Sequence, residues 1–176
     1  MDSWTTSPSA LATGDLLGAE LPADVLVGGA QQGLDLLFRA LLDPGDTVVT
    51  EAPTYHMGLD LLAFHRARVA PVRVRPIAAR AGGLATLDFD ALSIALEQRP
   101  SLAYVMPTCQ NPTGLTLDLP TRVRLVSMLK DAGVLLVEDD YEAGMLHSGD
   151  PLPLACSLPQ SGETVYLGTL SKALFP

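Results

Sequence analysis

The fold of this chain is decided by residues 134–141, Val-Leu-Leu-Val-Glu-Asp-Asp-Tyr, in which a short apolar run ends in acidic and aromatic side chains. Apolar runs of this length, rich in branched side chains, are typical of a buried strand. Asp139 places a carboxylate at the end of that strand, and a buried carboxylate needs a cationic or hydrogen-bonding partner. Tyr141 follows two residues later and could present its phenol to the same cavity. Alternatively, Asp139 could only cap the loop that follows.

Similar runs recur along the chain and alternate with stretches of helical spacing. The runs predict strands at 25–27, 47–50, 69–74, 102–106, 134–137 and 164–167. The helical spacing predicts helices at about 31–42, 55–66, 89–99 and 119–132, the third with Asp88 as its N-cap. This alternation favours an α/β fold, a doubly wound, mostly parallel sheet with helices on both faces. Residues 1–24 lack periodicity and predict a mobile lead-in, so the domain is expected at 25–176.

Composition narrows the classes of function. With 176 residues, 48% of them hydrophobic, the chain suffices for one domain with a substantial core. A net charge of −9 opposes attraction to phosphate backbones, so we expect no direct nucleic-acid binding.

Cys109 and Cys156 fit no disulfide or metal-ligand pattern, which favours free thiols and predicts no metal site. No apolar run approaches the ~20 residues of a membrane helix. The first residues do not resemble a secretory signal, so a cytoplasmic location is expected.

A lysine follows the last predicted strand, in the sequence Tyr-Leu-Gly-Thr-Leu-Ser-Lys that ends at Lys172. Partial desolvation by Leu170 and Leu174 would favour the neutral amine, which can attack a carbonyl and form a Schiff base. A Ser-Lys pair is common, however, so an ordinary surface lysine is the other interpretation.

Two further motifs follow predicted strands. Asn111 stands in an Asn-Pro-Thr-Gly sequence, which orients its amide but is also ordinary turn chemistry. Residues 28–33, Gly-Gly-Ala-Gln-Gln-Gly, do not match the dinucleotide fingerprint, because alanine occupies the place of its second glycine. They could form an anion site at a helix N-terminus, or only start a helix. Open α/β sheets place ligands at the carboxyl ends of their strands, so we expect Asn111, Asp139, Tyr141 and Lys172 to converge there.

In this order and at these separations, the motifs resemble the large domain of fold-type I, pyridoxal-phosphate-dependent aminotransferases of class I/II. The similarity covers about residues 25–176. Within that family the chain is most similar to the aminotransferase-like domain of MocR-type GntR regulators and to 2-aminoadipate and aromatic aminotransferases. The motifs are Gly-Ala-Gln-Gln, Asp-Pro-Gly-Asp, Pro-Thr-Tyr, Pro-Thr-x-Gln-Asn-Pro-Thr-Gly, Glu-Asp-Asp-Tyr and Tyr-Leu-Gly-Thr-x-Ser-Lys.

The resemblance implies a role for each candidate around the cofactor ring. Lys172 would form the Schiff base with pyridoxal 5'-phosphate and act as the catalytic base. Asp139 would pair with the ring N–H, while Tyr141 and Asn111 would hydrogen-bond the phenolate oxygen of the ring. Tyr55 would stack on the ring face, or alternatively pack on the core as an aromatic residue at a helix start.

The resemblance also implies a phosphate site. Backbone N–H groups of Gly29, Ala30 and Gln31 would bind the phosphate, helped by the hydroxyl groups of Thr169 and Ser171. Ala30 lacks the hydroxyl that some relatives carry at this position, which removes one possible contact.

Other family features have no counterpart in these residues. Family members carry an arginine beyond the lysine for the phosphate, an antiparallel strand there, and a small domain with a second arginine for the substrate carboxylate. All would lie past Pro176, so we expect a truncated large domain that is inactive alone. The complete protein would be a homodimer that transfers an amino group between an amino acid and a 2-keto acid. A cofactor-sensing domain of a MocR-type regulator and a non-functional fragment are the alternatives.

Overall fold

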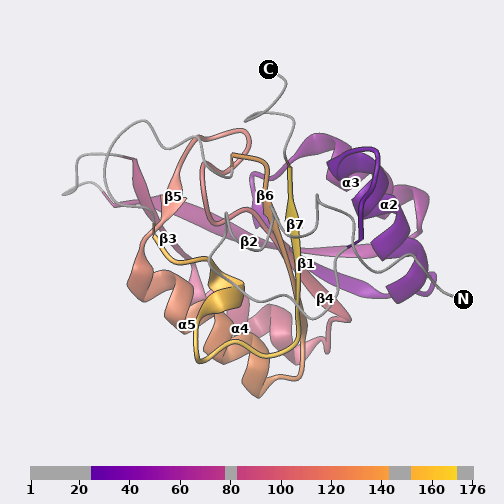
Figure 1. Cartoon of the computed structure of the whole chain (residues 1–176). Helices are drawn as coiled ribbons and strands as arrows, with labels where there is room; N and C mark the ends of the chain where they lie inside the picture. The colour runs from indigo at the N-terminus through magenta and orange to yellow at the C-terminus, as the bar shows by residue number, and fades with distance from the viewer. Residues whose placement is uncertain (1–24, 78–82, 143–151, 170–176) are drawn as a thin grey trace, which may run out of the picture.

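The protein is an α/β layer structure built on one seven-stranded sheet (Figure 1). The computed structural model describes residues 25–77, 83–142 and 152–169. The strands are β1 (Thr47–Ala52), β2 (Arg68–Pro76), β3 (Leu84–Leu87), β4 (Leu102–Val105), β5 (Thr116–Leu117), β6 (Leu135–Asp140) and β7 (Thr164–Gly168). The helices are α2 (Ala30–Leu41), α3 (His56–Phe64), α4 (Phe89–Glu97) and α5 (Leu119–Asp131), followed by a short 3-10 turn, η1 (Ala155–Ser157).

The sheet is mostly parallel, which confirms the predicted fold class. Its strand order is β5-β3-β2-β1-β4-β6-β7, and the strands from β2 to β7 in this order run parallel to one another. β3 pairs antiparallel with β2, and β5 runs parallel to β3 at the outer edge. β3 and β5 are absent from the predicted strands, because segments of four and two residues are too short to show a clear periodicity.

The predicted strand at 25–27 is wrong. These residues belong to no strand, and the side chains of Val25 and Leu26 are 81% and 82% exposed. A strand requires a neighbour to satisfy its backbone groups, and none of the described residues pairs with this segment. Its branched composition expresses only a local preference, which the tertiary context overrides.

The four predicted helices are present, and their ends differ from the prediction by at most two residues. Asp88 caps α4 as predicted, since its carboxylate accepts a hydrogen bond from the Ala91 N–H at 3.2 Å. Asp118 caps α5 in the same way, through the Thr121 N–H at 3.0 Å. Gly133 follows α5 with a φ of 66°, which suits glycine at a helix end. Within the described ranges, no helix is long and apolar enough to cross a membrane.

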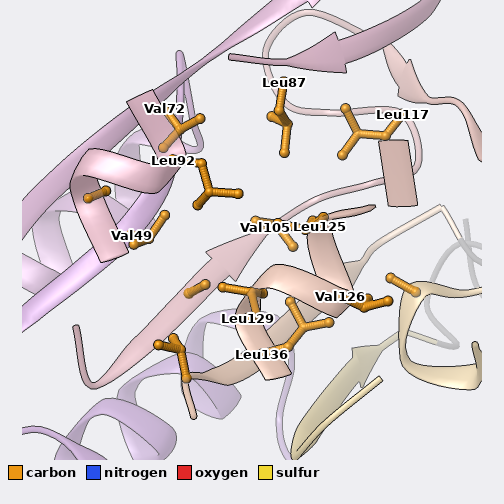
Figure 2. Close-up of a cluster of buried hydrophobic side chains, with 14 of the residues drawn as sticks. Val49, Val72, Leu87, Leu92, Val105, Leu117, Leu125, Val126, Leu129 and Leu136 are labelled. Carbon is orange, nitrogen blue, oxygen red and sulfur yellow. The ribbon is translucent and has the colours of Figure 1, made fainter. Parts of the chain in front are cut away.

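Helices cover both faces of the sheet and bury two separate cores. On one face, α4 and α5 pack against β-strand residues such as Val49, Val105 and Leu136 (Figure 2). On the other face, α2 and α3 bury a second cluster that includes Tyr104 and Val137. Because side chains alternate along a strand, the face of β6 that carries Val137 also carries the candidate carboxylate two residues later.

The chain reverses its direction across the sheet between β1 and β4. From β1 it proceeds to β2 and β3 on one side, and it later continues through β4, β6 and β7 on the other. Ligands of open α/β sheets bind at such a reversal, outside the carboxyl ends of the strands. The segments that leave β1 and β4 at this point are those that carry Tyr55 and Asn111.

Candidate cofactor site at the carboxyl edge of the sheet

Four of the predicted site residues lie at or directly beyond the carboxyl ends of neighbouring strands. Asp139 is the next-to-last residue of β6, and Tyr141 follows that strand directly. Asn111 lies in the loop after β4, and Tyr55 is the N-cap residue of α3 in the turn after β1. The strand of residues 134–137 therefore extends further than predicted and includes its acidic residues.

The Asp139 carboxylate is buried with one oxygen satisfied and the other unsatisfied. The Tyr104 hydroxyl donates to Oδ2 at 2.8 Å. Oδ1 is buried and has no hydrogen-bond partner within the described residues. Burial raises the pKa of Asp139 to about 6, while the hydrogen bond from Tyr104 acts in the opposite direction. A cationic N–H group placed at Oδ1 would relieve this cost, as a protonated pyridine would.

Hydrogen bonds connect Tyr141 to the loop that carries Asn111. The Tyr141 hydroxyl donates to the Cys109 carbonyl oxygen at 2.5 Å. Cys109 has a positive φ of 47°, and Asn111 stands two residues further along this loop. Tyr141 therefore lies beside the segment that its predicted partner Asn111 occupies, although its hydroxyl is already engaged there.

A buried glutamine joins the Tyr55 turn to the Asn111 loop. Gln110 is fully buried, and its Nε2 donates to the carbonyl oxygens of Pro53 at 2.6 Å and Asn111 at 2.9 Å. Its Oε1 accepts from the Thr113 N–H at 3.2 Å and from the Thr113 hydroxyl at 2.5 Å. The prolines on both sides of this link, Pro53 and Pro112, follow cis peptide bonds. One side chain thus sets the spacing between the turns after β1 and β4.

The start of α2 carries the residues predicted to bind an anion, Gly29, Ala30 and Gln31. Gly29 is the N-cap residue, has a φ of 124°, and makes no side-chain capping hydrogen bond. The backbone N–H groups of the first helical turn have no intrahelical partner, so they are available to an anion. Gln31 contributes Nε2 to the Met57 carbonyl oxygen of α3 at 3.4 Å, whereas its buried Oε1 has no partner among the described residues. The Tyr55 hydroxyl donates to Met57 Sδ at 2.9 Å, which brings Tyr55 to the same place.

Strand β7 directs the chain to the same edge. It runs parallel to β6, with Leu167 opposite Asp139 in the register. Thr169 follows β7 directly and is half-buried. Ser171 and Lys172 lie outside the described residues, so the convergence of Lys172 on this edge stays a prediction.

Three ionisable side chains, Glu51, Arg122 and Glu138, are buried near the opposite face of the sheet from Asp139. Burial raises the pKa of Glu51 to about 8, and its Oε2 accepts the Met106 N–H at 2.9 Å. Glu138 accepts the N–H groups of Ala155 and Cys156 at 3.0 and 2.8 Å, which fixes η1 against β6. Arg122 is buried with them and supplies positive charge without a direct carboxylate contact within the described ranges.

Tyr104 and Gln110 hydrogen-bond to candidate site residues or to the turns that carry them, and sequence reasoning does not single out either one. Tyr104 stands inside an apolar run, where an aromatic side chain reads as core. Gln110 belongs to the quoted Pro-Thr-x-Gln-Asn-Pro-Thr-Gly motif, which gave a signal, but its four hydrogen bonds become apparent only in three dimensions.

A doubly wound sheet with an unpartnered buried carboxylate oxygen at its carboxyl edge, among the described residues, and an open helix N-terminus is typical of a ligand-binding α/β domain. Comparison with known proteins identifies the family of this domain. Residues 14–174 match the sequence profile of aminotransferase class I and II, and the chain belongs to this family.

Named relatives include both a regulator and enzymes. The probable rhizopine catabolism regulatory protein MocR of Rhizobium meliloti is 34% identical, over 86% of this chain and 29% of that protein. Kynurenine aminotransferase of Pyrococcus horikoshii, solved in complex with PMP, is 31% identical with a TM-score of 0.77, over 93% of this chain and 40% of that one. LysN, the α-aminoadipate aminotransferase of Thermus thermophilus, solved with N-(5'-phosphopyridoxyl)-L-leucine, is 35% identical with a TM-score of 0.72, over 83% and 36%. The chain therefore spans between 29% and 40% of the length of these proteins.

Proposed function

We propose that this chain is the cofactor-binding part of a pyridoxal-phosphate-dependent aminotransferase, which transfers an amino group between an amino acid and a 2-keto acid. The observation that carries the proposal is Asp139 Oδ1, a buried carboxylate oxygen without a partner within the described residues. A pyridine N–H is the group that would satisfy it, and the ring would then lie at the reversal point of the sheet.

The residues at this edge suit the remaining parts of the cofactor. The first turn of α2, from Ala30, offers backbone N–H groups to the phosphate, with Thr169 and Ser171 as hydroxyl donors. Asn111 and Tyr141 would orient the phenolate oxygen of the ring, and Tyr55 would cover one face of it. Tyr141 would have to share or exchange its hydrogen bond to Cys109 to do so.

Pyridoxal phosphate, when bound, supplies an electron-withdrawing ring that weakens the Cα–H bond of an attached amino acid. Asp139 would hold the ring nitrogen protonated, which maintains that withdrawal. Lys172 would anchor the cofactor, and its Nζ would take the proton from the substrate Cα. No metal ion is required by these roles, and the described residues contain no group of three or more metal-ligating side chains.

The lysine assignment has a simple test, because Lys130 and Lys172 are the two lysines of the chain. The full-length protein is mixed with pyridoxal phosphate, reduced with borohydride and mapped by peptide mass spectrometry. We expect the label on Lys172, and its loss in Lys172→Arg. The matched variant Lys130→Arg alters the other lysine, which lies near the end of α5, and should keep the label. A label found on Lys130 alone would refute the assignment.

A second candidate is a cofactor-sensing domain of a transcription regulator, which the similarity to MocR favours. Both candidates use the same cofactor contacts. A full-length protein that binds the cofactor, produces no keto acid from a panel of amino acids and shifts a DNA duplex would support the sensor. The net charge of −9 indicates that any DNA contact would lie outside these residues.

We also propose a homodimer in the cytoplasm. Phe64 at the end of α3 is 72% exposed, as expected of an apolar side chain that a partner covers. Cys109 and Cys156 are both free, which suits a reducing compartment. Light scattering of the full-length protein tests the dimer.

A further inference from the structure

Tyr104 on β4 is held more tightly than its place in an apolar run suggests. Its ring is fully buried and packs edge-on against Phe38 of α2, with ring centroids 6.2 Å apart. From α3, Gly58 approaches so closely that a Cβ atom there would lie 3.1 Å from Tyr104 Cε1. Two helices and the strand therefore fix the direction of the hydroxyl group.

The Tyr104 hydroxyl points toward Asp139, the candidate partner of the cofactor ring nitrogen. Tyr104 stands opposite Val137 in the β4–β6 register, and Asp139 lies two residues further on the same face of β6. The hydroxyl donates to Asp139 Oδ2 at 2.8 Å and leaves Oδ1 without a partner in the described part of the chain. Asp140, the next residue on β6, adds negative charge nearby, so the Tyr104 hydroxyl supplies stabilisation that this neighbour does not.

We propose that Tyr104 is a positioning residue for the cofactor: its hydroxyl holds the Asp139 carboxylate in its charged form and leaves Oδ1 to accept the ring N–H of pyridoxal phosphate. The inference rests on the proposed function, because it concerns how Asp139 serves that ring. Tyr104 would touch neither the cofactor nor the substrate and would act through Asp139.

The physical consequence concerns one shared proton. A carboxylate that accepts a hydrogen bond from Tyr104 is a weaker base, so the proton between Asp139 and the ring stays on nitrogen. Without the hydroxyl, the carboxylate becomes a stronger base and draws the proton toward itself. The ring nitrogen would then be less protonated even when the cofactor remains bound.

The chain contains a matched control for this effect. Tyr166 on β7 donates its hydroxyl to Asp140 Oδ2 at 3.3 Å. This is also a tyrosine-to-carboxylate bond between neighbouring strands, but Asp140 lies on the other face of β6. Tyr166→Phe therefore removes the same hydroxyl from the same kind of pair without affecting Asp139.

The experiment uses the full-length protein with pyridoxal phosphate labelled with 15N in the ring, whose NMR shift separates protonated from neutral nitrogen. In the unchanged protein and in Tyr166→Phe we expect the protonated signal. In Tyr104→Phe we expect a shift toward the neutral signal and a dissociation constant for pyridoxal phosphate raised about tenfold. A substitution of Tyr104 by 4-aminophenylalanine, which keeps a weaker donor in place, should give an intermediate shift and serves if Tyr104→Phe does not fold.

Each outcome decides the question. A protonated signal retained by bound Tyr104→Phe, or by the 4-aminophenylalanine variant, would overturn the role of Tyr104. So would an equal shift in Tyr166→Phe. Failure of the unchanged protein to bind pyridoxal phosphate would instead overturn the proposed function itself, so the two failures are distinguishable.

Discussion

At the scale of single residues, Glu51 is a group whose environment strongly opposes its charge. It is 1% exposed, one of its carboxyl oxygens has no partner within the described residues, and burial raises its pKa to about 8. Because the folded state holds this proton more tightly than the unfolded chain does, the resulting stability is complete below a pH of about 4.5. It is lost as the pH rises through about 8.

We therefore predict that Glu51→Gln changes how stability depends on pH. Between pH 6 and pH 9 the unchanged protein should lose roughly 3 kcal/mol of unfolding free energy that the glutamine variant keeps. Urea unfolding at both pH values measures this difference. Glu163→Gln, at an exposed position before β7, is the control and should match the unchanged protein. An equal loss in Glu51→Gln would show that another group titrates.

Arg122 is a second buried residue, and its contribution to stability depends on the hydrogen bonds it makes there. Its guanidinium donates to the carbonyl oxygens of Leu117, Pro107 and Pro153 at 2.9, 2.9 and 3.0 Å and to the Thr108 hydroxyl at 2.9 Å. One side chain of α5 thus holds the loop after β4 and the segment before η1.

Replacing Arg122 with methionine keeps much of the volume and removes all four of these hydrogen bonds, although the Pro107 oxygen still accepts the Leu117 N–H at 2.8 Å. We predict a loss of about 3 kcal/mol or more in unfolding free energy, measured by urea denaturation. Arg124→Met makes the same charge change two residues along α5, where Arg124 is exposed and stacks 4.0 Å from the Phe89 ring centre. That variant should lose no more than about 1 kcal/mol. Similar losses in both variants would contradict the proposed role of the buried contacts.

The sequence predicts where the candidate site residues lie better than it predicts their contacts. Asp139 lies near the end of β6, and Asn111 and Tyr55 follow β4 and β1, so pattern and position suffice to predict that all three lie at this edge of the sheet. The Tyr104 and Gln110 contacts join segments far apart in sequence, and no periodicity encodes such a pair. Tyr141 shows the same limit, since its bond to Cys109 depends on the path of a loop.

At the scale of elements, the two turns that flank the reversal of the sheet are linked by Gln110. We predict that Gln110→Ala lets both turns move apart, because it removes all four hydrogen bonds of a fully buried side chain. Amide hydrogen exchange should accelerate in the Tyr55 turn and the Asn111 loop, and affinity for pyridoxal phosphate should fall about tenfold.

The exposed Gln98 at the end of α4 provides the control. Gln98→Ala should leave exchange in both turns and cofactor affinity unchanged. If Gln110→Ala also left exchange in the two turns unchanged, Gln110 would not be what holds them at their spacing.

Elements were predictable where local and tertiary signals agree. α4 and α5 have an apolar stripe and an aspartate cap, and both lie close to their predicted bounds. Residues 25–27 have the composition of a strand but no partner in the described sheet. β3 and β5 have partners but too few residues to produce a pattern.

At the scale of the whole molecule, the first described helix and the last described strand touch. A Cβ atom at Gly33 of α2 would lie 2.6 Å from Leu167 Cδ1 of β7. We predict that Gly33→Val destabilises the fold by about 1 to 3 kcal/mol, although replacing a glycine inside a helix normally favours the helix. Thermal or urea unfolding measures the change.

Two further variants test whether this contact is the cause. Leu167→Ala, combined with Gly33→Val, should recover part of the loss, which a double-mutant cycle quantifies. Ala40→Val places the same residue at an exposed position of α2 and should cost less than about 1 kcal/mol. Strict additivity of Gly33→Val and Leu167→Ala would be inconsistent with direct packing.

The contact between α2 and β7 can form only late in synthesis of the chain. The ribosome adds about 5–20 residues per second from the N-terminus, so α2 emerges long before β7 does. Until β7 pairs with β6, α2 lacks the surface on which Gly33 rests. Contacts this distant in sequence form slowly. The helix start proposed to hold the phosphate is thus synthesised early, but it gains its contact with β7 only after nearly all of the described chain has emerged. A nascent chain therefore lacks the complete phosphate site.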